Sequence, residues 1–200
     1  MLIIKLINVI YKTKILMYQR YEKMQKKIDD IKDKKVRKFK VGDLAVYPAH
    51  GVGRIEAIES RVVNDETHDF YIMKVVENNM LIMIPTWNVE SVRLRDIISK
   101  HEISKVYDVI RRNQDSLINN QTWNRRYREY MDKIKTGSIY DVAEVFRDLY
   151  FIKITKDLSF GERKLFDTAT NLLVSELSIA ANTNEETMMS KIESLFDEPE

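Results

Sequence analysis

Residues that interrupt regular structure divide this chain into two kinds of segment. Three of its five glycines and two of its three prolines lie between residues 39 and 96. Glycine and proline punctuate short strands. Between residues 99 and 195 the only glycines are Gly137 and Gly161, and there is no proline. This segment instead contains serines and threonines that can cap the starts of helices. A run of strands followed by a run of helices is typical of an α+β protein.

Four runs rich in valine, isoleucine and aromatic residues predict strands in the first segment. They are Asp43–Tyr47, Gly53–Val63, Phe70–Val76 and Met80–Ile84. Asn64-Asp65 and Asn78-Asn79 predict hairpin turns, because asparagine and aspartate tolerate positive φ. One hairpin is marginal alone, whereas four or five short strands can curl into a barrel with its own core. We therefore expect a small β-barrel over residues 39–97.

Four capping boxes predict where helices begin in the second segment. In each box a hydroxyl residue and an acid three residues later satisfy backbone amides that a helix start leaves open. The pairs are Ser99 with Glu102, Ser138 with Asp141, Ser159 with Glu162, and Thr183 with Glu186. Apolar residues follow at helical spacing, for example at Leu165, Ala169, Leu172, Leu173 and Leu177. We expect residues 98–195 to form a compact, all-helical domain.

Charge is distributed unevenly along the chain, although the net charge is only +2. Residues 1–35 carry ten basic and four acidic side chains, and residues 166–200 carry one basic and eight acidic. This asymmetry favours an anionic partner for the basic parts, and the alternative is a set of solvated charges. We expect a basic extension over residues 1–38, either disordered or arising from a translation start assigned too early. Residues 196–200 form an acidic tail.

Several functional classes find no support in the sequence. The chain has no cysteine, and His50, His68 and His101 do not show the spacing of metal ligands. Phosphate-binding glycine loops and the nucleophile elbow of hydrolases are absent. The apolar start is shorter than the ~20 residues of a membrane span and lacks a signal-peptide cleavage site. We therefore expect a cytoplasmic protein that is not an enzyme and binds no cofactor, metal or small-molecule substrate.

A fifth helix, predicted to begin near Thr122, departs from the other four. Where a capping box would place an acid it has Arg125, followed by Arg126 and Arg128. Cations in a first turn oppose the helix dipole and cost about 0.3–1 kcal/mol each. A cluster that costs stability favours a functional explanation. Open amide donors, the helix dipole and several arginines together suit a phosphate.

Trp123 stands at the tip of this fifth helix. An indole beside arginines can stack on a base or wedge into a minor groove. The alternative is that Trp123 packs on Tyr127, one helical turn away, while the arginines are solvated. Spacing alone leaves both open. The other tryptophan, Trp87, follows Pro85 at the end of a predicted strand, where packing in the core or at the rim of the barrel is expected.

Taken together, these residues resemble the CarD/CdnL family of bacterial transcription regulators over about residues 39–195. The motifs are Phe39-Lys40-Val41-Gly42-Asp43, Tyr47-Pro48-Ala49-His50-Gly51-Val52-Gly53, Ile84-Pro85, Trp123-Asn124-Arg125-Arg126-Tyr127, Val142-Ala143-Glu144-Val145, Arg147-Asp148-Leu149, Leu158-Ser159 and Gly161-Glu162. The resemblance implies a Tudor-like β-barrel that binds the RNA polymerase β subunit. It also implies a helical domain that contacts promoter DNA at the upstream edge of the transcription bubble, without reading sequence.

The resemblance assigns roles on the DNA side. Trp123 matches a tryptophan that wedges into the minor groove and stabilises the open complex. Arg125, Arg126 and Arg128 match its basic neighbours, which would hold the phosphate backbone. We therefore expect promoter DNA to be one partner.

On the polymerase side, Arg61 matches a basic contact position. Met83 stands where some relatives carry a second basic contact, so that contact is either absent here or replaced by an apolar one. We expect a monomer that binds the polymerase β subunit. The β segment also resembles the polymerase-interacting domain of transcription-repair coupling factors, so a recruitment module without DNA contact stays open. The basic, apolar N-terminus leaves peripheral membrane binding as a further alternative, although we expect no membrane partner.

Overall fold

The computed structural model describes residues 38–112 and 122–196. Backbone contacts divide the chain into two units, residues 1–38 and residues 39–200, and the second holds almost all of the described residues. The expectations for the basic extension over residues 1–38 and for the acidic tail over residues 196–200 fall, except for Lys38 and Phe196, outside the described ranges. The second unit, taken by itself, consists of a sheet and a set of helices.

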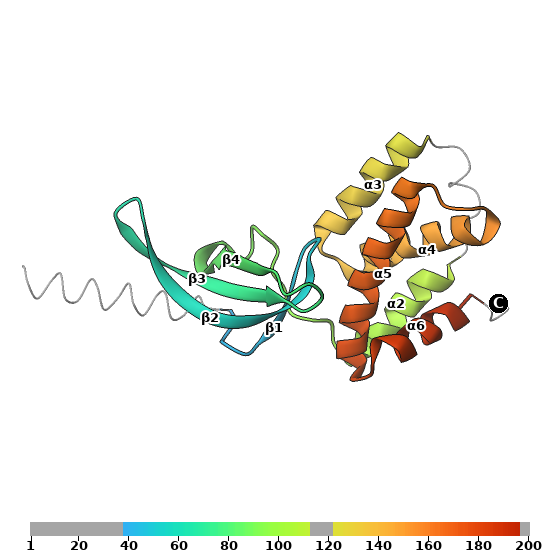
Figure 1. The fold of residues 1–200 in the computed structure, drawn as a ribbon. Coiled ribbons are helices and arrows are strands. Elements are labelled where there is room, and N and C mark those ends of the chain that lie inside the picture. The colour runs from blue at the N-terminus through green and yellow to red at the C-terminus, as the bar shows by residue number, and fades with distance from the viewer. Residues whose placement is uncertain (1–37, 113–121, 197–200) are drawn as a thin grey trace, which may run out of the picture. The chain divides into compact units, whose positions relative to one another are not determined.

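The first half of this unit is a curled, antiparallel, four-stranded sheet in the order β1-β2-β3-β4 (Figure 1). The strands are β1 (Leu44–Tyr47), β2 (Gly51–Val63), β3 (Glu66–Val75) and β4 (Leu81–Pro85). All four predicted runs are strands, with ends that differ by at most four residues. Asn64 and Asp65, which join β2 to β3, both adopt positive φ, as a tight hairpin turn requires.

The expected barrel takes the form of a Tudor-like half-barrel. After β4, the 3-10 helix η1 (Thr86–Asn88) and a turn lead into a segment that packs on the inner face of the sheet through Val89 and Leu94. Strand β4 stays an edge strand, while an isolated bridge joins Val46 of β1 to Arg95. The buried core of the sheet consists of Phe39, Ala45, Ile55, Tyr71, Met73, Ile84, Val89 and Leu94.

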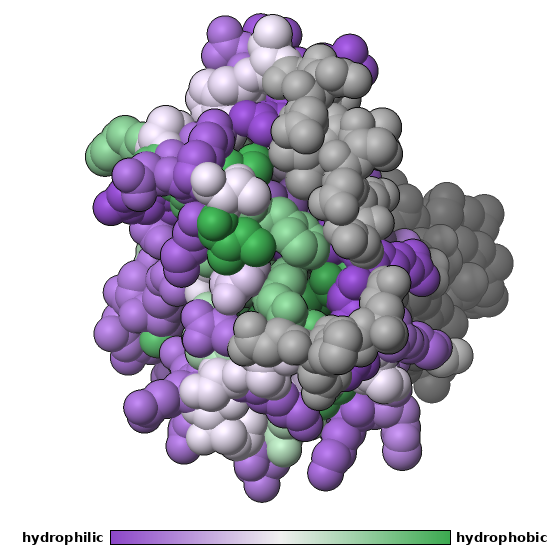
Figure 2. All heavy atoms as spheres, turned by 90° about the vertical axis from the view of Figure 1, so that its right-hand side faces the viewer, coloured by the Kyte–Doolittle hydropathy of each residue, from purple (hydrophilic) through white to green (hydrophobic). Residues whose placement is uncertain are grey.

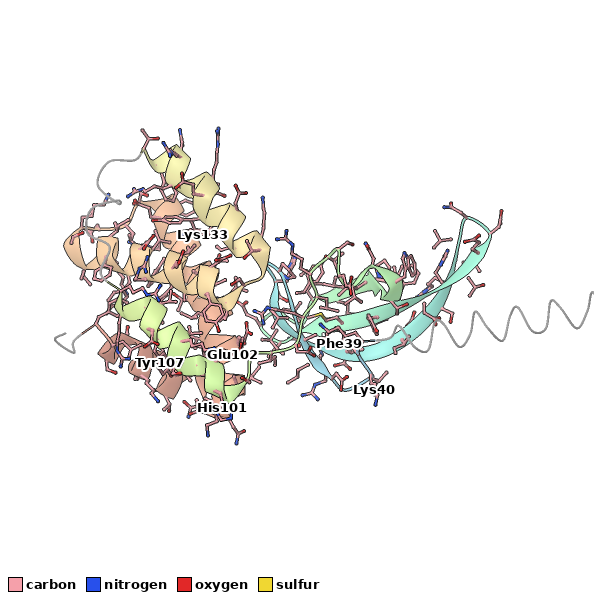
Figure 3. All side chains as sticks on the ribbon, turned by 180° about the vertical axis from the view of Figure 1, so that it is seen from behind. Phe39, Lys40, His101, Glu102, Tyr107 and Lys133 are labelled. Carbon is pink, nitrogen blue, oxygen red and sulfur yellow. The ribbon has the colours of Figure 1, made fainter. Side chains whose placement is uncertain are left out.

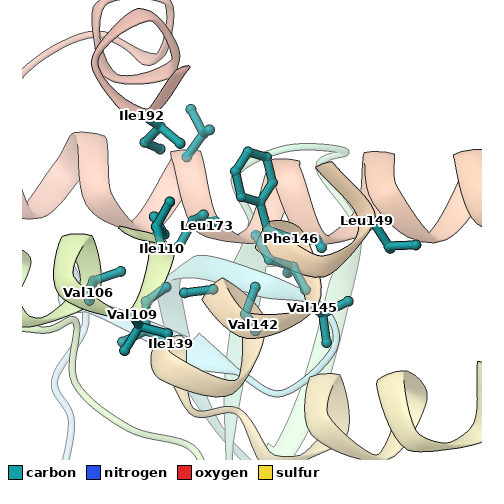
Figure 4. Close-up of a cluster of buried hydrophobic side chains, with 14 of the residues drawn as sticks. Val106, Val109, Ile110, Ile139, Val142, Val145, Phe146, Leu149, Leu173 and Ile192 are labelled. Carbon is teal, nitrogen blue, oxygen red and sulfur yellow. The ribbon is translucent and has the colours of Figure 1, made fainter. Parts of the chain in front are cut away.

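The second half of the unit is helical, which confirms the expected α+β class. Its elements are η2 (Lys100–Glu102), α2 (Ile103–Arg111), α3 (Trp123–Thr136), α4 (Ile139–Thr155), α5 (Phe160–Ala181) and α6 (Glu185–Ser194). They share one core, in which Ile110, Phe146, Leu173 and Ile192 come from four different helices (Figure 4). On the face seen in Figure 2, hydrophobic residues gather near the middle and hydrophilic residues surround them. In the described ranges, none of the helices has both the length and the apolarity needed to cross a membrane.

Three of the four predicted helix caps are present. Full capping boxes form at Ser99 and Ser159, and Ser138 accepts a hydrogen bond from the amide of Asp141. The box at Ser99 begins the 3-10 turn η2, which leads directly into α2. Local hydrogen bonding therefore decides where these helices start.

The predicted cap at Thr183 is wrong by one residue. Helix α5 ends with Asn182 in the left-handed conformation, and the amide of Thr183 donates to the carbonyl of Ser178. Thr183 therefore completes the end of α5. Asn184 caps α6 in its place, because its side chain accepts a hydrogen bond from the amide of Thr187.

Replacing a buried leucine tests the helical core. The Leu173 side chain is fully buried, so Leu173→Ala should lower the free energy of unfolding by about 2–5 kcal/mol through the cavity it leaves. Urea unfolding followed by circular dichroism measures the loss. Leu81→Ala makes the same change at a side chain that is 64% exposed, and should cost less than about 0.5 kcal/mol. Equal losses for the two variants would contradict this assignment of the core.

Candidate nucleic-acid interface

The start of α3 lies against the start of α5. Thr122 is the N-cap of α3 but makes no side-chain capping bond, and the first turn contains no acid. Trp123 is partly buried and packs against the helical core. A Cβ added to Gly161, the second residue of α5, would lie 3.0 Å from Cζ2 of the indole. Glycine at this position therefore allows the ring to approach the backbone of α5.

Residues of α3 itself frame the Trp123 ring. The Tyr127 ring lies 5.5 Å away between centroids, at an interplanar angle of 57°. The guanidinium of Arg126 lies 6.0 Å from the indole centroid. The packing of Trp123 on Tyr127 that the spacing allowed is thus present, while Tyr127 is itself 43% exposed. The indole is neither enclosed in the core nor free of neighbours.

The three arginines of this helix start differ in their surroundings. Arg126, with a side chain only 12% exposed, donates from Nη2 to Oε1 of Glu162 at 3.1 Å. Arg125 is exposed and pairs with Glu129 one turn later, at 3.0 Å. Such exposed pairs contribute little, so Arg125 can exchange its partner for another anion. Arg128 is exposed and forms no ion pair within the described residues. Several side chains that end in nitrogen project outward from this end of α3 (Figure 3).

Glu162 links the two helix starts. Its Oε2 accepts from the backbone N–H and the hydroxyl of Ser159, and Lys156 Nζ lies 3.7 Å from its Oε1. Burial would raise the pKa of Glu162, but the Ser159 hydrogen bonds, with Lys156 and Arg126, outweigh burial and hold that pKa below its ordinary value. The ionised carboxylate supplies, from α5, the negative charge that the first turn of α3 lacks.

Phe160, the first residue of α5, is the most exposed large hydrophobic side chain in the described ranges, at 87%. It is the chain neighbour of Gly161, which touches the indole. Sequence reasoning did not single out Phe160, although a signal was available, because it falls outside the apolar stripe that begins at Leu165. An aromatic ring left in water offers a face on which a base can stack.

The residues assigned to the polymerase side share one face of the sheet. The register places Arg61 opposite His68, and Met83 opposite Ile72. Because alternate residues of a strand point to the same face, these four side chains lie on the face opposite the sheet core. Arg61 is exposed and pairs with Glu59, and Met83 is 54% exposed.

Trp87 lies at the rim of the sheet, which confirms the expectation of core or rim packing. Its ring contacts those of His68, at 4.5 Å, and Phe70, at 5.3 Å, and about half of its surface is exposed. Leu81, at the start of β4, lies on the outer face with Met83 and is also exposed. The outer face therefore offers an apolar strip of Leu81, Met83 and Trp87 beside an open edge strand.

No group of three or more histidine, aspartate or glutamate side chains in the described part of the chain is placed to hold a metal ion.

In comparisons with known proteins, one family model matches the part of the chain that forms the sheet and another matches the part that forms the helices. The family model "CarD-like/TRCF RID domain" matches residues 39–98, and "CarD, C-terminal domain" matches residues 105–193. The "Putative transcription factor YdeB" of Bacillus subtilis (strain 168) is 36% identical over 153 residues, which cover 76% of this chain and 98% of the relative. A solved structure, "CdnLNt from Myxoccoccus xanthus", is 51% identical, covers 30% of this chain and 86% of its own, and has a TM-score of 0.27.

Gly161→Ala tests the close packing of the indole. The added Cβ would lie 3.0 Å from Trp123 Cζ2, so the indole should shift while the helix itself stays intact. The expected result is a changed chemical shift of the Trp123 indole N–H in a proton–nitrogen NMR spectrum. The Trp87 indole N–H, in the sheet, is the internal control and should not change. An unchanged Trp123 signal would show that the ring does not pack on Gly161.

The stability that Glu162 contributes should depend on pH. Its pKa is lowered on folding, so its contribution is present above its ordinary pKa of 4.5 and is lost as pH falls through the lower, folded pKa. Glu162→Gln should cost about 1 kcal/mol at pH 7, and the difference from wild type should shrink below pH 4.5. Urea unfolding at several pH values measures it, with Glu90→Gln as an exposed control. A difference that is constant with pH would refute this role.

Proposed function

We propose that this chain, which belongs to the CarD/CdnL family of transcription regulators, binds RNA polymerase through its sheet and promoter DNA through the starts of α3 and α5. The expected result of binding both is a longer-lived open complex. The family membership supports a role in transcription and is consistent with polymerase binding. The DNA contact rests on the side chains at the two helix starts.

The observation that carries the DNA contact is that each of two apposed helix starts presents an aromatic residue. Phe160 is 87% exposed, and Trp123 is held beside its neighbour Gly161. Aromatic side chains that wedge between or stack on bases favour distorted or melted DNA over the intact duplex. In this proposal Trp123 supplies a supported ring at the upstream edge of the bubble, and Phe160 supplies a second ring.

The three arginines have different roles in this proposal. Arg125 and Arg128 are exposed and suit the phosphate backbone, which gives affinity without sequence preference. Arg126 is held by Glu162 and lies near the indole, so its role in the proposal is mainly to support Trp123. Because the helix dipole adds to the arginine charges, the start of α3 attracts an anion more strongly than either feature alone.

The proposed polymerase surface is the outer face of the sheet with the open edge of β4. Arg61 and Met83 lie on this face, together with exposed Leu81 and Trp87. An edge strand can receive a strand from the β subunit, while the apolar strip and Arg61 add specificity. The sheet then tethers the helix starts near the promoter, so that weak DNA binding suffices. A protein that binds the open state better than the closed state shifts the population toward it.

The lifetime of the open complex tests the DNA contact. Trp123→Ala and Phe160→Ala should each shorten it about fivefold or more, because stacking on a base contributes about 1–3 kcal/mol. The measurement follows decay of open complexes with cognate polymerase after a competitor is added. Arg128→Ala should weaken the effect and lower its salt dependence, whereas Lys135→Ala, a matched exposed cation in the last turn of α3, should not.

Arg61→Glu separates the proposed function from its alternative. This change should weaken polymerase binding and thereby remove the effect on lifetime. If Arg61→Glu abolishes polymerase binding but Trp123→Ala and Phe160→Ala leave the lifetime unchanged, the chain is a recruitment module without DNA contact. Trp123→Ala should not alter polymerase affinity, which identifies its effect as one on DNA.

A further inference from the structure

Arg95 belongs to the sheet by its backbone and to the helices by its side chain. Its N–H donates to the carbonyl of Val46 at 3.1 Å, and its carbonyl accepts from Val46 at 2.7 Å. Its guanidinium donates from Nε to the carbonyl of Gly137 at 2.7 Å, and from both Nη atoms to the carboxylate of Glu176 at 2.5 and 2.8 Å. One residue thus joins β1, the end of α3 and the C-terminal half of α5.

Glu176 fixes the orientation of the Arg95 guanidinium. Its side chain is only 3% exposed, and its Oε1 also accepts from the backbone N–H of Ile98 at 3.2 Å. A buried carboxylate is tolerated only when it is paired and hydrogen-bonded. The planar guanidinium of Arg95 meets it with two parallel hydrogen bonds, which fix orientation as well as distance.

The turn between β1 and β2 packs closely beside this ion pair. A Cβ added to Gly137 would lie 2.8 Å from Cγ of Pro48, and one added to Gly51 would lie 3.0 Å from Cδ2 of Leu172. Gly137 is the left-handed C-cap of α3. The end of α3 is therefore held on both sides, by Pro48 packing and by the Arg95 hydrogen bond to its carbonyl.

Helix α3 runs from this fixed end at Gly137 to Trp123 at its other end (Figure 1). Its 14 residues span about 21 Å. Because α3 shares a core with the other helices, it turns with them, and a rotation of these helices by about 10° about Gly137 would move Trp123 by about 4 Å, given that length. The position of the indole relative to the sheet therefore depends on how firmly Gly137 is held.

We infer that the Arg95–Glu176 pair is a latch that holds the DNA-contacting start of α3 at a fixed position relative to the polymerase-binding sheet. Arg95 and Glu176 are positioning residues that touch neither partner. The functional part of this inference rests on the proposed function. The geometric part does not, and can be tested on the free protein.

Distance measurements test the geometric part. The chain has no cysteine, so Glu66→Cys at the exposed start of β3 and Asp132→Cys at an exposed position of α3 give a unique pair of spin-label sites. Double electron–electron resonance should show one narrow distance distribution, which Glu176→Gln or Arg95→Lys should broaden. Glu144→Gln, which weakens an ion pair between α3 and α4, is the matched control and should leave the distribution narrow. Thermal unfolding of each variant confirms that it is folded.

Open-complex lifetime tests the functional part in the full-length protein without labels. Glu176→Gln should shorten the lifetime about fivefold or more, as losing the aromatic contact would, while polymerase affinity stays unchanged. Trp123→Ala added to Glu176→Gln should then have a smaller effect than in the wild type. Glu144→Gln should have no effect on lifetime.

The outcomes separate the latch from the proposed function. A narrow, unchanged distance distribution in both folded latch variants overturns the inference whatever the transcription assay shows. A broadened distribution with an unchanged lifetime, when Trp123→Ala does shorten it, overturns the functional part. If Trp123→Ala itself has no effect, the proposed function fails, and the distance distributions still decide whether the latch exists.

Discussion

A buried carboxylate lies at the junction between the sheet and the helices of this unit. Glu176 is nearly inaccessible to water, and a charge in such a place is costly unless its lone pairs are all satisfied. Arg95 and the amide of Ile98 satisfy it from the segment that follows the sheet. If Arg95 were withdrawn while Glu176 stayed buried, that charge would be left unpaired, so the pair disfavours such arrangements of the two halves.

The same principle operates at the start of α3. Its first turn lacks an acid, and Glu162 on α5 supplies one through its contact with Arg126. The Glu162 carboxylate is itself held by its hydrogen bonds to Ser159, so it cannot easily move to pair with a different cation. This arrangement stabilises one arginine and leaves Arg125 and Arg128 facing solvent. A helix start built in this way keeps positive potential available to an anionic partner.

The two candidate surfaces have different chemistry. The outer face of the sheet combines an open edge strand with exposed Leu81 and Met83, which suits a polypeptide partner. The starts of α3 and α5 combine aromatic rings with exposed cations, which suits nucleic acid. The two surfaces lie on halves of the unit that have separate hydrophobic cores. Binding at one surface therefore does not require the other surface to change its structure.

The sequence by itself determined the strands, the α+β class and most helix starts, since these depend on alternation, helical spacing and hydrogen bonds within about four residues. The sequence missed the cap at Asn184, where the end of α5 extends over Thr183, and it placed some strand ends up to four residues away. Tertiary structure alone decided that Arg126 is held by Glu162 and that Trp123 is partly covered. The reason is that the exposure of a side chain depends on neighbours distant in sequence: Glu162 lies 36 residues after Arg126.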